Sequence, residues 1–308
     1  MSIVKTSLPN YVEEKRFDLI RNAVVGARTV EEINLQTGIK GATALNLLDT
    51  DVKFGDGAAC GWSEAGTSSL SQRILTPGQI KVNMSFCDKS LLSTYANYQV
   101  RIAAGQKTLP FEEDFVAGVV DDVKAKLEKA IWQGDSSTTN ANTETNKFDG
   151  FIKIAEAATL GGTATYAANA AIVDKVNSVY ALIPTACYSK GDVVLFMGAD
   201  NYRKYIQALI ANGNLVITNV VNDVAMPASV LIPGTNVRVI PVAGLDGTDK
   251  MFASYRDNFV YGTDLAGDNE KFDLWYSQDN REFRLAIEFN AGVQFAYPSM
   301  VVEGKENA

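Results

Sequence analysis

The sequence predicts an α+β fold, because helix-type and strand-type hydrophobic patterns occupy separate stretches of the chain. Between Leu109 and Gln133, apolar residues recur at helical spacing and predict one long amphipathic helix. From Lys250 to the end, strand patterns follow one another, and residues 282–289 alternate between polar and apolar side chains. Residues 150–245 mix shorter helical and strand patterns, which completes a chain with both kinds of structure.

The first 45 residues are mixed and polar, and we interpret residues 1–45 as an N-terminal arm rather than a domain. A short helix is expected around Tyr11 to Val25 and a second near Val30 to Leu35. This arm shows no evident core of its own, so it is expected to reach over other parts of an assembly.

Residues 46–90 are expected to form an extended loop. The patterns of Ala44 to Phe54 and of Ile80 to Phe86 are extended, and we expect these segments to be the two arms of a long hairpin. Between them, Gly55 to Gly78 is rich in Gly, Ser and Thr, too long for a tight turn and too polar for a core.

The long helix is expected to span residues 109–133, with Pro110 in its first turn and Gly134 just after its end. Its apolar residues form one stripe, and charged residues fill the rest of its surface. The stripe holds Phe115, Val116, Val119, Val123, Leu127 and Ile131, whereas Glu113, Asp121, Lys124 and Glu128 are expected to face water. One face of this helix should therefore pack against a core.

Residues 150–245 predict a compact α+β domain whose central strands are covered by helices. The expected elements are a helix from Ala170 to Ile183 stopped by Pro184, a buried strand from Val193 to Met197, a helix capped by Asp200 and closed near Gly213, and a strand from Val237 to Val242.

Residues 271–289 predict a long antiparallel ribbon. Phe272, Leu274 and Tyr276 alternate with Lys271, Asp273 and Trp275 in the first strand, and residues 283–289 alternate in the second. Gln278 to Asn280 suits the turn between them. The apolar face of the ribbon is expected to pack on the long helix.

The sequence contains no histidine, which excludes Ser-His-Asp and Cys-His catalysis and every metal site that needs an imidazole ligand. Cys60, Cys87 and Cys187 include no closely spaced pair, so neither a disulfide framework nor a thiolate zinc site is indicated. No apolar run approaches the roughly 18 residues that would cross a bilayer. The chain is therefore not expected to associate with a membrane.

The net charge of −8 and the isoelectric point near 4.8 argue against tight, autonomous binding to nucleic acid. They do not argue against a container around DNA, because a shell confines its contents by closure.

Asp246 to Asp249 and Asp264 to Asp268 place carboxylates near glycines, as calcium loops do, but lack the spacing of an EF-hand and are expected to be solvated turns. We therefore expect no enzyme activity, no metal and no cofactor.

The order of these elements resembles the tailed-phage major capsid protein family of the Hong Kong 97 fold. The resemblance is carried by the long helix ending in Gly134-Asp135, the Ser/Thr/Asn loop, and Phe148-Asp-Gly-Phe151-Ile, with the closing run Gly292 to Pro298. It implies an N-terminal arm (1–45), an extended β-hairpin loop (46–90), a peripheral domain with the spine helix (91–149 and 246–291) and an axial domain (150–245 and 292–308).

The resemblance also implies a function. Such a subunit self-assembles through pentamers and hexamers into an icosahedral head that encloses a double-stranded DNA genome, with scaffolding, portal and decoration proteins as partners. It would be found in the virion capsid, and in the host cytoplasm before assembly. Two alternatives remain open: an encapsulin-type nanocompartment shell that encloses a cargo enzyme, and a histidine-free enzyme of unrecognised class.

Six residues are candidate subunit contacts: Phe54, Trp62, Glu64, Arg73, Lys81 and Asn280. Rigid aromatic side chains dominate interface energetics, which favours Phe54 and Trp62, and with them Trp275. The alternative is that each ring packs inside its own subunit. Glu64 and Arg73 are expected to form ion pairs between subunits. Some members of the family join subunits by a Lys–Asn isopeptide bond, for which Lys53, Lys81 and Asn280 are the candidates here.

Overall fold

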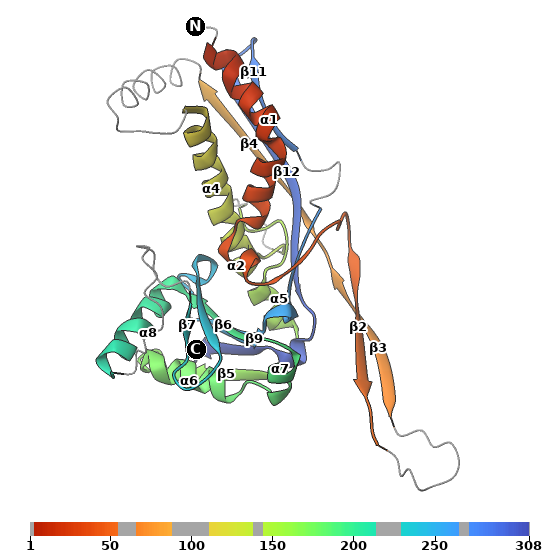
Figure 1. Ribbon diagram of the computed structural model, residues 1–308, viewed down its shortest axis with the longest axis vertical. Coiled ribbons are helices and arrows are strands. Elements are labelled where there is room, and N and C mark those ends of the chain that lie inside the picture. The colour runs from red at the N-terminus through yellow and green to blue at the C-terminus, as the bar shows by residue number, and fades with distance from the viewer. Residues whose placement is uncertain are drawn as a thin grey trace.

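The computed structural model describes residues 3–54, 66–87, 111–137, 144–213, 229–264 and 271–307. The described part has three regions: an elongated sheet with two long helices on it, a compact α+β unit at one end, and a projecting two-stranded hairpin (Figure 1). Cys60, Trp62, Glu64 and residues 265–268, for which the sequence analysis gave expectations, lie outside the described residues.

The elongated sheet is organised around β12 (Glu282–Phe295), a strand of 14 residues. Its other strands are β1 (Asn34–Gln36), β4 (Gly78–Cys87), β10 (Phe259–Thr263) and β11 (Lys271–Ser277). Strand β11 pairs antiparallel with β12, Phe272 opposite Ile287, which confirms the predicted ribbon and its turn. On its other edge β12 pairs with β4, Ile80 opposite Phe289.

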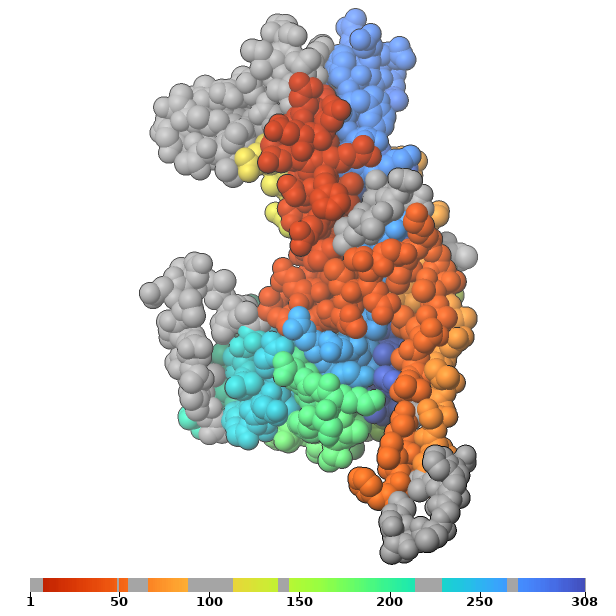
Figure 2. Space-filling view, turned by 45° about the vertical axis from the view of Figure 1, so that its right-hand side comes forward, coloured from red at the N-terminus to blue at the C-terminus, as the bar shows by residue number. Residues whose placement is uncertain are grey.

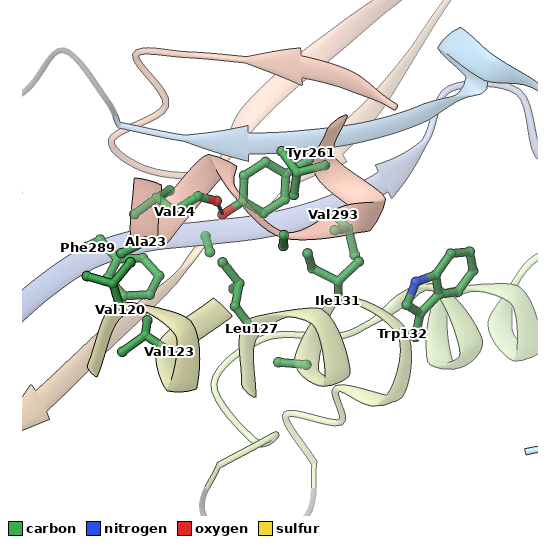
Figure 3. Close-up of a cluster of buried hydrophobic side chains, with 14 of the residues drawn as sticks. Ala23, Val24, Val120, Val123, Leu127, Ile131, Trp132, Tyr261, Phe289 and Val293 are labelled. Atoms are coloured by element: carbon green, nitrogen blue, oxygen red, sulfur yellow. Dashed lines mark hydrogen bonds between the residues drawn. The ribbon is translucent and has the colours of Figure 1, made fainter. Parts of the chain in front are cut away.

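Two helices of equal length cover one face of this sheet, α1 (Ile3–Val25) and α4 (Phe111–Gln133). Helix α4 confirms the predicted long helix, and its stripe from Val116 to Ile131 is buried against β12 and α1 (Figure 3). Tyr261 on β10 also reaches across this core, where its hydroxyl donates to the carbonyl oxygen of Val24 at 3.3 Å. A short helix, α2 (Arg28–Glu31), follows α1 and lies against α4.

The compact unit is built on a six-stranded sheet in the order β5, β13, β9, β6, β8, β7. The strands are β5 (Gly162–Tyr166), β6 (Val193–Gly198), β7 (Val230–Leu231), β8 (Arg238–Val242), β9 (Met251–Tyr255) and β13 (Val302–Glu306). The helices are α5 (Phe151–Ala157), α6 (Ile172–Ala181), α7 (Thr185–Lys190) and α8 (Ala199–Ala211), with single 3₁₀ turns at Ala243–Leu245, Arg256–Asn258 and Pro298–Met300.

Strand β6 is buried on both faces, which explains its continuous run of apolar residues. Val193, Leu195 and Met197 face the core beneath α6 and α8, whereas Val194 and Phe196 face the core shared with the long helix. The compact sheet thus has one face toward its own helices and the other toward the elongated part of the molecule.

An aromatic cluster joins the two sheets where α4 ends. Its six rings come from six elements, with centroid separations of 5.0 to 6.5 Å: Trp132, Phe151, Phe196, Phe252, Phe259 and Phe295. Beside the cluster, the Gly150 nitrogen donates to the Gly134 carbonyl oxygen at 2.9 Å. A Cβ at Gly150 would lie 2.6 Å from the Gly134 nitrogen, so this crossing of two backbone segments requires glycine.

Several sequence-based expectations were wrong. The hairpin partner of β2 (Thr43–Asp51) is β3 (Thr67–Leu75), which lies inside the stretch expected to be a loop, and Ile80–Phe86 pairs with β12 instead. The first residues do have a core, because Leu8, Val12 and Leu19 on α1 are buried against this same chain. Tertiary contacts decided both cases. The local pattern of β2 allows either partner strand, and the pattern of the first residues does not show which distant segment covers them.

Four smaller expectations were also wrong. Helix α8 is capped by Asp246, whose Oδ1 accepts from the Ala199 nitrogen at 2.6 Å, rather than by Asp200. Glu128, expected to face water, is buried. Strand β9 lies in the compact sheet and residues 292–295 lie in the elongated sheet, so the crossing between sheets differs from the expected limits at 246 and 292. Leu35, expected to end a helix, lies in β1.

Candidate assembly interface

The hairpin β2–β3 extends away from the rest of the molecule (Figures 1 and 2). Its strands pair antiparallel from Thr43 opposite Leu75 to Asp51 opposite Thr67. In the described part of the chain, each of the two strands pairs only with the other, so both outer edges carry unpaired backbone groups. An isolated two-stranded hairpin is marginally stable in water, and this one is fixed at its root.

The root of the hairpin is held by a small hydrophobic cluster. Leu45 and Leu75 are buried there with Ile39, Val260 and Ala296. Polar contacts add to it, since Gln294 Nε2 donates to the Ile74 carbonyl oxygen at 2.8 Å. The hairpin is thereby anchored to the end of β12 and to β10, while its outer length is left uncovered.

One face of the hairpin carries apolar side chains that nothing in the described structure covers. Leu48 stands directly opposite Leu70, and Ile74 lies on the same face. Their exposed fractions are 58%, 80% and 61%, and toward the tip Val52 and Phe54 are also exposed. We call these five residues the hairpin apolar surface. The polar pair Asn46 and Gln72 lies between Ile74 and the two leucines on this face. Several apolar side chains left uncovered on one face favour protein association.

The face of the elongated sheet away from α1 and α4 forms a groove of about 580 Å³. Three strands line it with residues from the segments Lys81 to Ser85, Lys271 to Trp275 and Glu282 to Glu288. Lys81 pairs with Glu288 at 3.2 Å across β4 and β12, and Trp275 on β11 is 44% exposed. The groove is an open sheet face on which charged side chains stand beside apolar ones, among them Met84 and the large ring of Trp275.

The candidate contact residues differ in their surroundings. Phe54 is fully exposed beyond β2. Arg73 forms no ion pair in the described structure; it is half-buried on the inner face of the hairpin, where Nη2 donates to Gln294 Oε1 at 3.1 Å and burial lowers the pKa of its guanidinium. Arg73 therefore anchors the hairpin within its own subunit. Sequence reasoning missed Leu48, Leu70 and Ile74, because their shared face depends on a strand pairing that local patterns did not reveal.

The candidates for covalent joining lie apart within one chain. Asn280 lies at the turn of the ribbon, where its Nδ2 is 3.5 Å from Oε1 of Glu282, the first residue of β12. Lys81 on β4 stands opposite Glu288, which lies further along β12. Six residues of strand separate these two points, a distance of about 20 Å. Lys53 pairs with Asp51 at 3.7 Å. A bond between subunits from these residues stays a prediction.

The two acidic segments that were expected to be solvated turns differ: Asp264 is fully buried, so that expectation was wrong for this residue. Asp246 serves as the cap of α8, in a turn where Gly247 has a φ of +74°. Within the described ranges, no group of three or more Cys, Asp or Glu side chains could hold a metal ion. No helix among those residues is long and apolar enough to span a membrane.

No protein-family model matches the sequence, and no curated protein matches it either. Solved structures do match in fold. The procapsid of satellite phage P4 with its size determination (Sid) protein has a TM-score of 0.63 at 11% identity, covering 94% of this chain and 90% of that one. The capsid of an empty GTA particle has a TM-score of 0.56 at 12% identity, with 92% and 90% covered.

A third match is the virus-like particle from Pyrococcus furiosus, with a TM-score of 0.53 at 9% identity, covering 95% of this chain and 98% of that one. Because nearly the whole of each chain is covered, the similarity concerns the complete arrangement of helices and sheets rather than one motif. The chain therefore has the α+β fold of phage capsid proteins.

Proposed function

We propose that this chain is the major structural subunit of a phage head, with the Hong Kong 97 arrangement of hairpin loop, peripheral domain and axial domain. Copies would assemble through pentamers and hexamers into an icosahedral shell that encloses double-stranded DNA. The observation that carries this proposal is the projecting hairpin with its uncovered apolar surface, in a chain whose whole fold matches capsid structures. The role is structural rather than catalytic.

The hairpin apolar surface supports association between copies. Each fully buried Leu or Ile side chain contributes about 1.5 to 3 kcal/mol relative to full exposure. Leu48, Leu70 and Ile74 are already partly covered, so burying the exposed remainder of all three would contribute about 3 to 6 kcal/mol to each hairpin contact. In a closed shell every subunit would offer one hairpin and receive another, so a modest contact is repeated over the whole assembly.

The charge of the chain is compatible with containment. A net charge of −8 gives little electrostatic attraction to DNA, so the genome would be held by closure of the shell. Scaffolding, portal and decoration proteins would be its partners. The chain would act in the virion capsid after assembly in the host cytoplasm.

An encapsulin-type shell is the alternative container. The fold of this chain is similar to that of the virus-like particle as well as to those of the phage capsids. Sedimentation velocity followed by electron microscopy of the purified chain, alone and with a scaffolding protein, tests the container function. Closed shells or rings of five and six would support it, and a persistent monomer under both conditions would contradict it. Analysis of shells isolated from the native host then distinguishes DNA from a cargo enzyme.

A further inference from the structure

Tyr297 lies where the hairpin meets the compact unit. Its ring packs against the hydrophobic cluster at the hairpin root and also against the core of the compact unit. Its hydroxyl donates to the carbonyl oxygen of Leu48 on β2, with 3.3 Å between the two oxygens. One side chain therefore touches both parts.

The main chain of Tyr297 is fixed to the compact unit by a buried polar network. The Tyr297 nitrogen donates to Asn258 Oδ1 at 2.6 Å, and Asn258 Nδ2 donates to the Tyr297 carbonyl oxygen at 2.9 Å. Asn258 Nδ2 also donates to Ser254 Oγ on β9 at 2.8 Å. Because Asn258 and Ser254 are fully buried, these bonds are shielded from competition with water.

The ring of Tyr297 is also oriented from the compact unit. Lys190, the last residue of α7, places its Nζ 4.0 Å from the centroid of the ring. A cation in this position is attracted to the ring face. The backbone, the ring face and the hydroxyl of Tyr297 are thus each constrained by a different neighbour.

A second point of attachment holds the other strand. Gln294 on β12 donates from Nε2 to the Ile74 carbonyl oxygen on β3, and its Oε1 accepts from Arg73. Gln294 belongs to the elongated sheet, whereas Tyr297 is tied to the compact unit. A body held at one point can pivot, and a second point on the neighbouring strand removes that freedom.

We propose that Tyr297 is a positioning residue that sets the direction of the hairpin relative to the compact unit. Without its contact to Leu48, the hairpin would keep its root cluster and its Gln294 attachment but would swing over a wider range. One further step rests on the proposed function: the direction of the hairpin determines where its apolar surface meets a neighbouring copy, and hence which shells form.

The test is a distance measurement between spin labels on Thr50→Cys in the hairpin and Asn177→Cys on α6, two exposed positions. Cys60 and Cys87 are replaced by serine, and Cys187, which is buried, is kept. Labelled chains are mixed with an excess of unlabelled ones, so that the distances measured are within one chain. Tyr297→Phe keeps the ring and removes the hydroxyl, while Tyr297→Ala removes both.

We expect the distance distribution to broaden in Tyr297→Phe and to broaden and shift further in Tyr297→Ala, with a smaller broadening in Lys190→Met. Tyr188→Phe on α7, whose hydroxyl bonds to Tyr180 on α6, and Lys204→Met on α8 remove the same kinds of group without removing a contact of Tyr297, and they should leave the distribution unchanged. A wild-type distribution in both Tyr297 variants would overturn the inference, whatever their assembly.

Assembly of the same variants tests the further step separately. A changed distribution of shell sizes or a loss of closed shells in Tyr297→Phe supports that step, and unchanged shells despite a broadened hairpin distribution overturn it. If the wild-type chain forms no shell with or without a scaffolding protein, the proposed function fails, and the distance measurement still decides the role of Tyr297.

Discussion

The hydroxyl of Thr29 is shared by two side chains of the long helix. Trp132 Nε1 donates to Thr29 Oγ1 at 2.7 Å, and the Thr29 hydroxyl in turn donates to the buried carboxylate of Glu128. The Thr29 nitrogen donates to the same carboxylate at 3.0 Å. These three buried residues from α2 and α4 thus satisfy one another's hydrogen-bonding groups. The bonds attach the N-terminal segment to the long helix.

Thr29→Val preserves the shape of the side chain, but it should destabilise the chain strongly because it removes the hydroxyl. It leaves the indole N–H of Trp132 without its acceptor and removes one donor from Glu128. An unsatisfied buried polar group costs about 1 to 3 kcal/mol, so we expect a loss of about 2 to 4 kcal/mol in the free energy of unfolding. Urea unfolding measures it, with Thr50→Val on the exposed hairpin as a matched control. A loss no larger than that of the control would contradict this account of the network.

Burial raises the pKa of the Glu128 carboxyl, although the hydrogen bonds from Thr29 oppose that effect. A carboxyl whose pKa is raised by folding contributes stability that is fully present below its unfolded pKa of about 4.3 and is lost as the pH rises through the higher folded-state pKa. Glu128→Gln does not titrate. We therefore expect the variant to gain stability relative to wild type as the pH rises from about 4 to about 8.

Urea unfolding across that pH range measures this difference, with Glu13→Gln on the exposed side of α1 as control. The expected result is a difference between wild type and Glu128→Gln that changes steadily in favour of the variant toward neutral pH. A difference independent of pH would show that the carboxyl of Glu128 titrates alike in the folded and unfolded chain.

At the scale of elements, the segment after α4 is shaped by backbone contact. Asp135 accepts from the nitrogen and hydroxyl of Ser137, which with the nearby Lys153 lowers the pKa of its carboxyl to about 2. Asp149 accepts from Ser136 at 2.8 Å. These bonds close the loop so that Gly134 and Gly150 cross in contact, and the chain enters α5 with Phe151 in the aromatic cluster.

Gly150→Ala should disrupt that crossing. The new Cβ would lie 2.6 Å from the Gly134 nitrogen and 2.7 Å from the Trp132 carbonyl oxygen, and backbone atoms cannot move aside as side chains do. Overpacking costs about 1 to 3 kcal/mol, and we expect at least the upper end of that range. Gly118→Ala on the open side of α4 is the control; nothing lies within 4 Å of its Cβ, so it should gain about 0.5 to 1 kcal/mol. Urea midpoints that move alike in the two variants would refute the steric argument.

At the scale of the whole molecule, the hairpin apolar surface is mostly exposed in the described part of the chain. We expect Leu48→Thr with Leu70→Thr to leave the urea midpoint close to wild type and to weaken assembly about tenfold or more, because a loss of about 1.4 kcal/mol per contact is a tenfold change. Sedimentation velocity as a function of concentration measures this effect.

Ser69→Thr with Ser71→Thr puts the same residue type on the opposite face of the hairpin and should assemble as wild type does. Equal impairment of both double variants would indicate that the hairpin backbone, rather than its apolar surface, makes the contact. Unimpaired assembly of the leucine variant would remove the hairpin apolar surface from the interface.

Much of the fold could be predicted because some elements carry their partners in their own pattern. The stripe on α4, the fully apolar β6 and the alternating ribbon β11–β12 each show which side must be buried, and the structure places them so. Strand β3 could not be found in this way. Thr67–Leu75 is polar and mostly exposed, so burial leaves no signature in its sequence.

The sequence by itself determined the α+β class, the long helix with its buried stripe and the ribbon, because periodicity records which side of an element is buried. It also excluded histidine chemistry through composition alone. Only the tertiary structure decided the pairing of β2 with β3, the burial of α1 and Glu128, and the place of Tyr297 between hairpin and compact unit. These depend on contacts between residues far apart in the chain, and local spacing carries no information about which distant segment will supply the partner.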